Sequence, residues 1–212
     1  MVNDTGLELW YKRVQLLLET APKVTKPGFF AANPPDPTFT PSIQLPFSRA
    51  IQRDRIAAAW VVVAGKFDRA AYERAYATVI VGGEKVDRTA CEKTFEAMEK
   101  EGVDGLIVSD TNEFFTYMQL IADLAARFRV PAIYPMRDFV DVGGLMGYGI
   151  DIADGMRRVA NMTGQVLGGA KPSDIPFYRQ TKIDLVLNQK TATSLGLEFP
   201  PALLATADEV ID

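Results

Sequence analysis

Strand-like and helix-like segments alternate along the second half of the chain, and this alternation constrains the fold more than any other sequence feature. Short apolar runs typical of buried strands cover Gly105–Val108, Pro131–Tyr134 and Ile183–Leu187. Segments with apolar residues at helical spacing cover residues 88–101, 113–129 and 151–167. A strand, a crossover helix and a following strand require parallel pairing with helices packed on the sheet. The sequence therefore predicts an α/β protein whose parallel sheet has helices on both faces.

The first half of the chain is less regular. Residues 5–21 have the spacing of an amphipathic helix, in which Thr5 and Glu8 form a capping box. A buried strand over Gly28–Ala32 follows. Five prolines between residues 33 and 47 exclude helix and central strand, and predict an extended loop. Residues 48–83 are the hardest to interpret. Residues 51–64 fit one helix, although the β-branched run at 60–63 also fits a strand. Residues 68–76 are typical of a helix, and residues 78–81 of a strand.

Composition excludes several classes of function. The chain of 212 residues has no histidine and one cysteine, so a Ser-His-Asp triad, a histidine-ligated zinc and an internal disulfide are ruled out. The net charge of −4 gives no basic footprint for nucleic acid. No apolar run is long enough to span a membrane, and Met1–Trp10 lacks the apolar core of a signal peptide. Taken alone, these observations predict a cytoplasmic protein without a cofactor.

A small-ligand site is expected at the carboxyl ends of the strands, where open α/β sheets bind their ligands. The side chains and glycines that follow the predicted strands are the candidates. They are Asn33, Ser109, Asp110, Thr111, Tyr134, Arg137, Gly143, Gly144 and Tyr148. We expect the ring of Tyr134 to pack on the ligand, and the polar groups of Asn33, Ser109 and Asp110 to orient it.

Each candidate also has a purely structural interpretation. Asp110 or Thr111 can cap the following helix, with or without a ligand contact. Arg137 can clamp a ligand carboxylate or pair with Asp138 at the surface. Gly143 and Gly144 fit either a plain turn or a close backbone approach. Residue patterns alone therefore predict an α/β protein with a small-ligand cleft.

Several linked stretches resemble one family in the order expected for it. They are Pro131–Tyr134, Arg137–Gly149, Gly169–Pro176, Thr181–Asn188 and Leu195–Ile211. These stretches resemble the substrate-binding proteins of ABC transporters, relatives of the tryptophan- and tyrosine-binding type. The resemblance covers residues 103–212 well and residues 7–33 more loosely.

The resemblance implies a type I periplasmic-binding-protein fold, in which two lobes close on a small molecule, such as an amino acid, and deliver it to a permease. It also implies a periplasmic location. Residues 1–142 would form a ligand-binding lobe that starts at the crossover helix, and residues 143–212 would complete the lobes and the hinge. Most of the N-terminal lobe of the family is not matched.

Two further hypotheses follow from the sequence. The alternative function is a small α/β enzyme that uses Asp110, Arg137 and Asp138 without histidine. We also expect a homodimer. Residues 145–167 and 183–197 would normally help to cover the lobe that is not matched, and here they would leave apolar side chains exposed. That set comprises Leu145, Met146, Met156 and Val159. The Pro-rich loop 33–47 is the predicted reaching arm.

Overall fold

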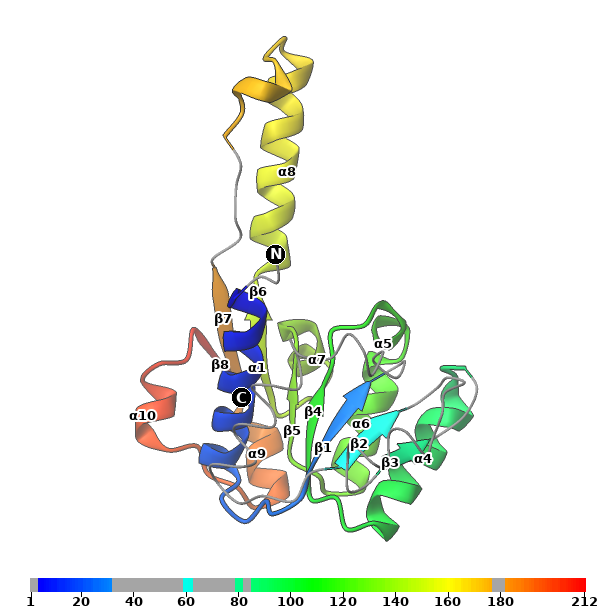
Figure 1. The fold of residues 1–212 in the computed structure, drawn as a ribbon. Coiled ribbons are helices and arrows are strands. Elements are labelled where there is room, and N and C mark those ends of the chain that lie inside the picture. The colour runs from blue at the N-terminus through cyan, green and yellow to red at the C-terminus, as the bar shows by residue number, and fades with distance from the viewer. Residues whose placement is uncertain (1–3, 32–58, 63–78, 82–84, 177–181) are drawn as a thin grey trace.

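The computed structural model describes residues 4–31, 59–62, 79–81, 85–176 and 182–212. These residues form an eight-stranded sheet in the order β3-β2-β1-β4-β5-β6-β7-β8. Its strands are β1 (Pro27–Ala31), β2 (Ala59–Val62), β3 (Val79–Val81), β4 (Gly105–Val108), β5 (Ala132–Tyr134), β6 (Met146–Ile150), β7 (Ile183–Asn188) and β8 (Glu209–Ile211). Figure 1 shows the helices on both faces of this sheet.

The predicted parallel core is confirmed. Strand β1 pairs in parallel with β4, and β4 with β5, with Phe29 beside Ile107 and Ile107 beside Ile133. The pair β6 and β7 is antiparallel, which the alternation pattern did not reveal. All of these strands belong to one sheet, and the division at residue 142 stays a prediction.

One face of the sheet is covered by α1 (Asp4–Thr20), α9 (Gln189–Leu195) and α10 (Pro201–Leu204). Helix α1 inserts Val14 and Leu17 against Ile107 and Ile133, and all four side chains are buried. This agrees with the periodicity of the first segment, because residues three and four apart share one face of a helix.

The opposite face is covered by α4 (Arg88–Lys100), α5 (Asn112–Thr116), α6 (Met118–Arg127) and α7 (Arg137–Asp141). Helix α4 begins at Arg88, where the predicted segment begins. The Asp87 side chain caps it by accepting a hydrogen bond from the Ala90 backbone N–H at 2.8 Å. The single helix expected over residues 113–129 is wrong in detail. The backbone leaves helical geometry at Tyr117 (φ −115°, ψ 16°) and divides it into α5 and α6.

Helix α8 (Ile152–Leu167) differs from the other helices, because none of its residues is buried. Its N-cap is Asp151, whose side chain accepts a hydrogen bond from the Asp154 backbone N–H at 2.9 Å. A short 3-10 turn, η1 (Pro172–Asp174), follows it. Figure 1 shows α8 standing away from the sheet, beyond its carboxyl edge. Within the described residues, none of the helices has the length and apolarity that a membrane span requires.

Candidate functional site

The parallel strands β4, β5 and β6 end at the same edge of the sheet. Three chain segments leave from this edge: Ser109–Thr111 after β4, Pro135–Arg137 after β5, and Asp151 after β6. This is the edge at which open α/β sheets bind ligands.

A cleft of about 370 Å³ opens at this edge beside β5 and β6. Phe115 of α5 forms one side of it, and Met136–Asp138 at the start of α7 form another. The end of β6 and the start of α8, residues 149–153, complete the wall together with Asp184 of β7. The cleft therefore collects an aromatic ring, a thioether and several carboxylates at one place.

Gly149 lines the cleft where β6 passes the end of β5. A Cβ at this position would collide with the Pro135 carbonyl oxygen, so that β6 can pass the end of β5 only with glycine here. The same close approach brings the Arg13 guanidinium near Gly149.

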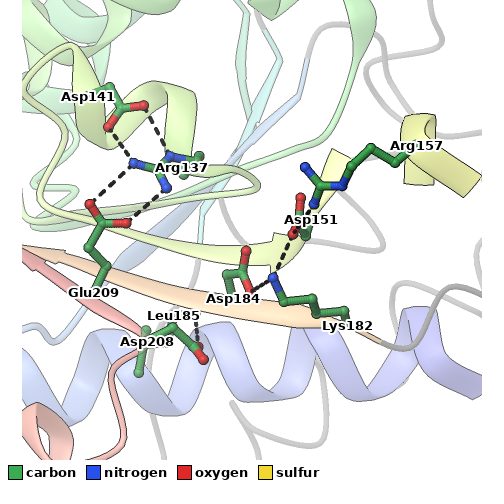
Figure 2. Close-up of polar contacts among 9 residues, drawn as sticks. All are labelled: Arg137, Asp141, Asp151, Arg157, Lys182, Asp184, Leu185, Asp208 and Glu209. Carbon is green, nitrogen blue, oxygen red and sulfur yellow. Dashed lines mark hydrogen bonds and ion pairs between the residues drawn. The ribbon is translucent and has the colours of Figure 1, made fainter. Parts of the chain in front are cut away.

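A network of charges joins two lining residues of the cleft, Asp151 and Asp184, to Lys182 (Figure 2). Lys182 Nζ donates to Asp151 Oδ2 at 2.7 Å and lies 3.7 Å from Asp184 Oδ1. The hydrogen bond from Lys182, together with that from the Asp154 N–H, lowers the pKa of Asp151 below its ordinary range. Burial acts in the opposite direction at Asp184 and raises the pKa of its carboxyl group.

Arg137 is held from two sides. Its Nη1 donates to Glu209 Oε2 at 2.9 Å, and its Nε lies 3.3 Å from Asp141 Oδ2. Figure 2 shows both carboxylates turned toward the guanidinium. These hydrogen bonds raise the pKa of Arg137. The predicted surface partner was Asp138, whereas the observed partners are Asp141, one turn along α7, and Glu209 of β8.

Arg13 is the residue near this edge that sequence reasoning missed. It is only 2% exposed, and its Nε donates to the Tyr148 carbonyl oxygen at 2.8 Å. Burial lowers the pKa of its guanidinium to about 10, and the negative charge of Asp110 acts against that shift. The sequence places Arg13 directly before Val14, on the apolar side of a helix. Beside Lys12, this position by itself indicates only a pair of basic residues and not a buried guanidinium.

The predicted residues after β4 lie at the expected edge. Ser109 is buried, and its backbone N–H donates to the Phe30 carbonyl oxygen at 2.9 Å. Thr111 occupies the N-cap position of α5 without a side-chain capping bond, and Ser109 Oγ lies 3.4 Å from Thr111 Oγ1. Asp110 is exposed. Asn33 lies outside the described residues.

The expectation that Tyr134 packs on a ligand does not hold in this structure. The ring is 1% exposed, stacks on Phe139 at 4.9 Å between centroids, and lies in the core beneath α7. Burial raises the pKa of its hydroxyl group. The physical reason is that a central strand of a parallel sheet is covered on both faces, so that an aromatic residue at its end can turn inward.

The two glycines after α7 serve the fold. Gly143 adopts φ +102°, which ends the α7 segment in a turn, and its carbonyl oxygen accepts from Thr191 Oγ1 at 3.0 Å. A Cβ at Gly144 would lie 2.6 Å from the Phe139 carbonyl oxygen and 2.7 Å from the Tyr134 ring. Tyr148 is half-buried and packs against the core cluster that contains α1. Of the predicted ligand-binding residues that the structure describes, Arg137 alone is among those that line the cleft, together with Asp138 of the enzyme alternative.

No metal-binding cluster is formed by three or more cysteine or carboxylate side chains in the part of the chain that the structure describes. The residues that line the cleft offer hydrogen bonds, charges and apolar contacts to a ligand.

Residues 86–211, more than half of the chain, match the family model described as "ABC transporter substrate binding protein". No curated protein sequence is significantly similar to the chain. Solved structures, by contrast, share its fold over almost its whole length.

An ABC domain in complex with L-Trp from Streptococcus pneumoniae has a TM-score of 0.64 at 24% identity, and the alignment covers 95% of this chain and 60% of that one. A conserved domain protein from Vibrio cholerae gives a TM-score of 0.64 at 17% identity, with the same coverages of 95% and 60%. An open, ligand-free substrate-binding protein with adhesive properties from Clostridium difficile gives 0.54 at 18%, covering 100% of this chain and 60% of that one. The chain therefore spans about 60% of the length of these structures.

Proposed function

Because the chain belongs to the ABC transporter substrate-binding protein family, we propose that it binds a small molecule and presents it to a transport system without changing it chemically. The observation that carries this proposal is the cleft beside β5 and β6, which lies at the ligand-binding edge of an α/β sheet. Its side chains are suited to holding a solute by contacts and charge.

The chemistry of the cleft favours a ligand with a cationic amine and an apolar body, as in an amino acid. Three carboxylates line or border it, from Asp138, Asp151 and Asp184. Lys182 neutralises part of the charge of Asp151 and Asp184, whereas Asp138 is available to accept a hydrogen bond from an ammonium group. Phe115 and Met136 supply apolar surface for the rest of the ligand. One structure of similar fold holds L-Trp, which agrees in ligand class.

The segment after β4 is a second contact region of the proposed site. Asp110 and Thr111 follow the strand next to β5 and lie at the same edge of the sheet. We propose that they orient a ligand that extends from the cleft toward β4. Arg137 contributes through its ion pairs, which fix the position of Met136 and Asp138.

The enzyme alternative gains no support from the geometry. It requires Arg137 to act together with Asp138 on a substrate, yet the guanidinium is bound to Asp141 and Glu209. We therefore propose a binding protein that makes and breaks no covalent bond.

The proposed setting follows from the family. Its members typically work in the periplasm or outside the cell. We propose the same location, an ABC permease as the receiving partner, and a second copy of this chain as a structural partner. The last point is supported by Met156 and Val159, which are both exposed on α8. Leu145 and Met146, which we also expected at that surface, are buried in the sheet core instead.

A thermal-shift panel of the L-amino acids and other amine-bearing metabolites tests this function. A ligand at 100 times its Kd stabilises the native state by about 2.7 kcal/mol, which raises the Tm of a chain of this size by roughly 5–10 °C. Asp138→Asn removes the carboxylate and should abolish most of that shift. Glu198→Gln, at the opposite edge of the sheet, is the matched control and should keep it. An unchanged Tm with every compound, or an equal shift in the Asp138 variant, would contradict the proposal.

A further inference from the structure

Lys182 is a cation that the protein itself places against the wall of the ligand cleft. It directly precedes β7, and its Nζ donates to Asp151 Oδ2 at 2.7 Å. The same Nζ lies 3.7 Å from Asp184 Oδ1, and both carboxylates line the cleft. Figure 2 shows the ammonium group in contact with both. One ammonium group therefore serves two carboxylates of the cleft wall.

The two carboxylates are compensated to different extents. Asp151 also accepts a hydrogen bond from the Asp154 backbone N–H at 2.9 Å. Asp184 lies on β7, its side chain is 19% exposed, and its contact with Lys182 is longer than a hydrogen bond. Burial raises the pKa of its carboxyl group, and the positive charge of Lys182 only partly opposes that effect. Of the two carboxylates, Asp184 therefore keeps more capacity to attract a cation from a ligand.

The arginines near the cleft are held by other carboxylates. Arg137 lines the cleft, but its guanidinium is bound to two carboxylates that do not line it. Arg157 Nη2 lies 3.9 Å from Asp151 and equally far from Asp154, so that its charge is divided between them. Lys182 makes the shorter contact, a hydrogen bond to Asp151. Among the described cations, its charge is therefore coupled most directly to the carboxylates of the wall.

We propose that Lys182 sets the charge selectivity of the cleft, which then accepts a ligand with one cationic amine and rejects a ligand with two. This inference rests on the proposed function, in which Asp138 accepts the amine. A second ammonium group would be drawn to Asp184, where it would lie close to Lys182. Like charges brought together in a partly buried place weaken binding strongly, and such repulsion is a common source of specificity.

Replacement of Lys182 by a neutral side chain should reverse this preference. Asp151 and Asp184 would then stand in the wall without their nearest cation, and a buried carboxylate without a partner is costly. A ligand cation that takes the place of the lysine offsets this cost. Asp138 belongs to α7 and Asp184 to β7, so that the two ends of a dicationic ligand can be met by separate carboxylates.

Calorimetric titration of the full chain with matched amino acids tests the inference. L-Norleucine and L-lysine have side chains of similar length that end in a methyl and an ammonium group, and L-ornithine is one methylene shorter than L-lysine. The wild type should bind L-norleucine at least about tenfold more tightly than either dication. Lys182→Met should change the ratio of the Kd values by at least about tenfold in favour of L-lysine or L-ornithine.

Two control variants separate local charge from other effects. Lys182→Arg keeps the positive charge and should keep the order of the wild type. Lys190→Met removes the same charge from α9, which follows β7 at the opposite edge of the sheet, and should also keep that order. A change of order in the Lys190 variant would assign the preference to net charge and overturn the inference. Circular dichroism and the Tm of each variant show that the fold is retained.

The outcomes for this inference and for the proposed function are distinguishable. Equal or tighter binding of a dication by the wild type would overturn the inference without any variant. A folded Lys182→Met variant that keeps the wild-type order, or that binds none of the three compounds, would overturn it as well. In each of these cases a ligand found in the thermal-shift panel leaves the proposed function standing. Binding of a dication by the variant alone supports the role of Lys182 even where L-norleucine binds to neither protein.

Discussion

The Asp151 carboxylate lies 2.7 Å from the Lys182 ammonium group, and this contact joins the first turn of α8 to the start of β7. Arg157 Nη2 lies 3.9 Å from the same carboxylate. Asp151 therefore caps the helix, binds the neighbouring strand and forms part of the cleft wall. Its charge therefore links the start of α8 to the start of β7.

The pH dependence of stability should report this contact. Hydrogen bonds from Lys182 and from the Asp154 N–H lower the pKa of Asp151 in the folded state. The stabilisation is therefore present above the ordinary carboxyl pKa of about 4 and is lost as the pH falls through the lowered folded value. Asp151→Asn keeps the cap but removes the charge. We expect the variant to have a lower Tm than wild type at pH 7 and the same Tm near pH 2. A constant difference at both pH values would contradict this account.

Substitution of Gly149 tests the close approach of β6 to Pro135, and substitution of Gly164, which has no such neighbour, is the matched control. A Cβ at Gly149 meets the backbone of Pro135, which cannot move aside, so Gly149→Ala should destabilise the fold by at least about 2 kcal/mol. Gly164 lies in α8, where no atom is within 4 Å of the place that a Cβ would take, and Gly164→Ala should stabilise the fold by about 0.5–1 kcal/mol. Urea unfolding of the two variants measures both changes. Equal effects would show that the approach at residue 149 is unimportant.

Cys91 should be unreactive in the native protein. Burial, with smaller contributions from Asp87 and Glu92, raises the pKa of its thiol to about 11. At pH 8 the thiolate is scarce and the sulfur is inaccessible. We expect no labelling by a disulfide reagent in buffer, and one equivalent after unfolding in guanidinium. Rapid labelling of the folded chain would show that α4 opens readily.

The sequence was sufficient for the parallel core of the fold. Apolar runs at β1, β4 and β5 and the Asp87 cap are local signals, and each acts within a few residues of the element that it sets. The antiparallel pairing of β6 with β7 is different, since Met146 pairs with Leu187, far along the chain, in a register that no local pattern encodes.

The candidate site was less predictable for the same reason. Sequence position placed Arg137 at the carboxyl edge, but its partner Glu209 lies 72 residues away. Tyr134 also lies at the carboxyl end of a strand, yet its ring turns into the core and stacks on Phe139. Arg13 was missed because a charged residue beside an apolar stripe is normally solvated. Here its guanidinium is buried and donates a hydrogen bond to the Tyr148 carbonyl oxygen.

The location of the bound ligand tests the central claim most directly. Amide chemical-shift mapping with the compound that gives the largest thermal shift compares two hollows at opposite edges of the sheet. The shift changes should cluster at residues 136–138 and 149–153, which line the cleft. Residues 22–24 and 196–198, which line the hollow at the amino edge, should remain unchanged. Changes confined to the amino edge, or the absence of any localised change at saturating ligand, would contradict it.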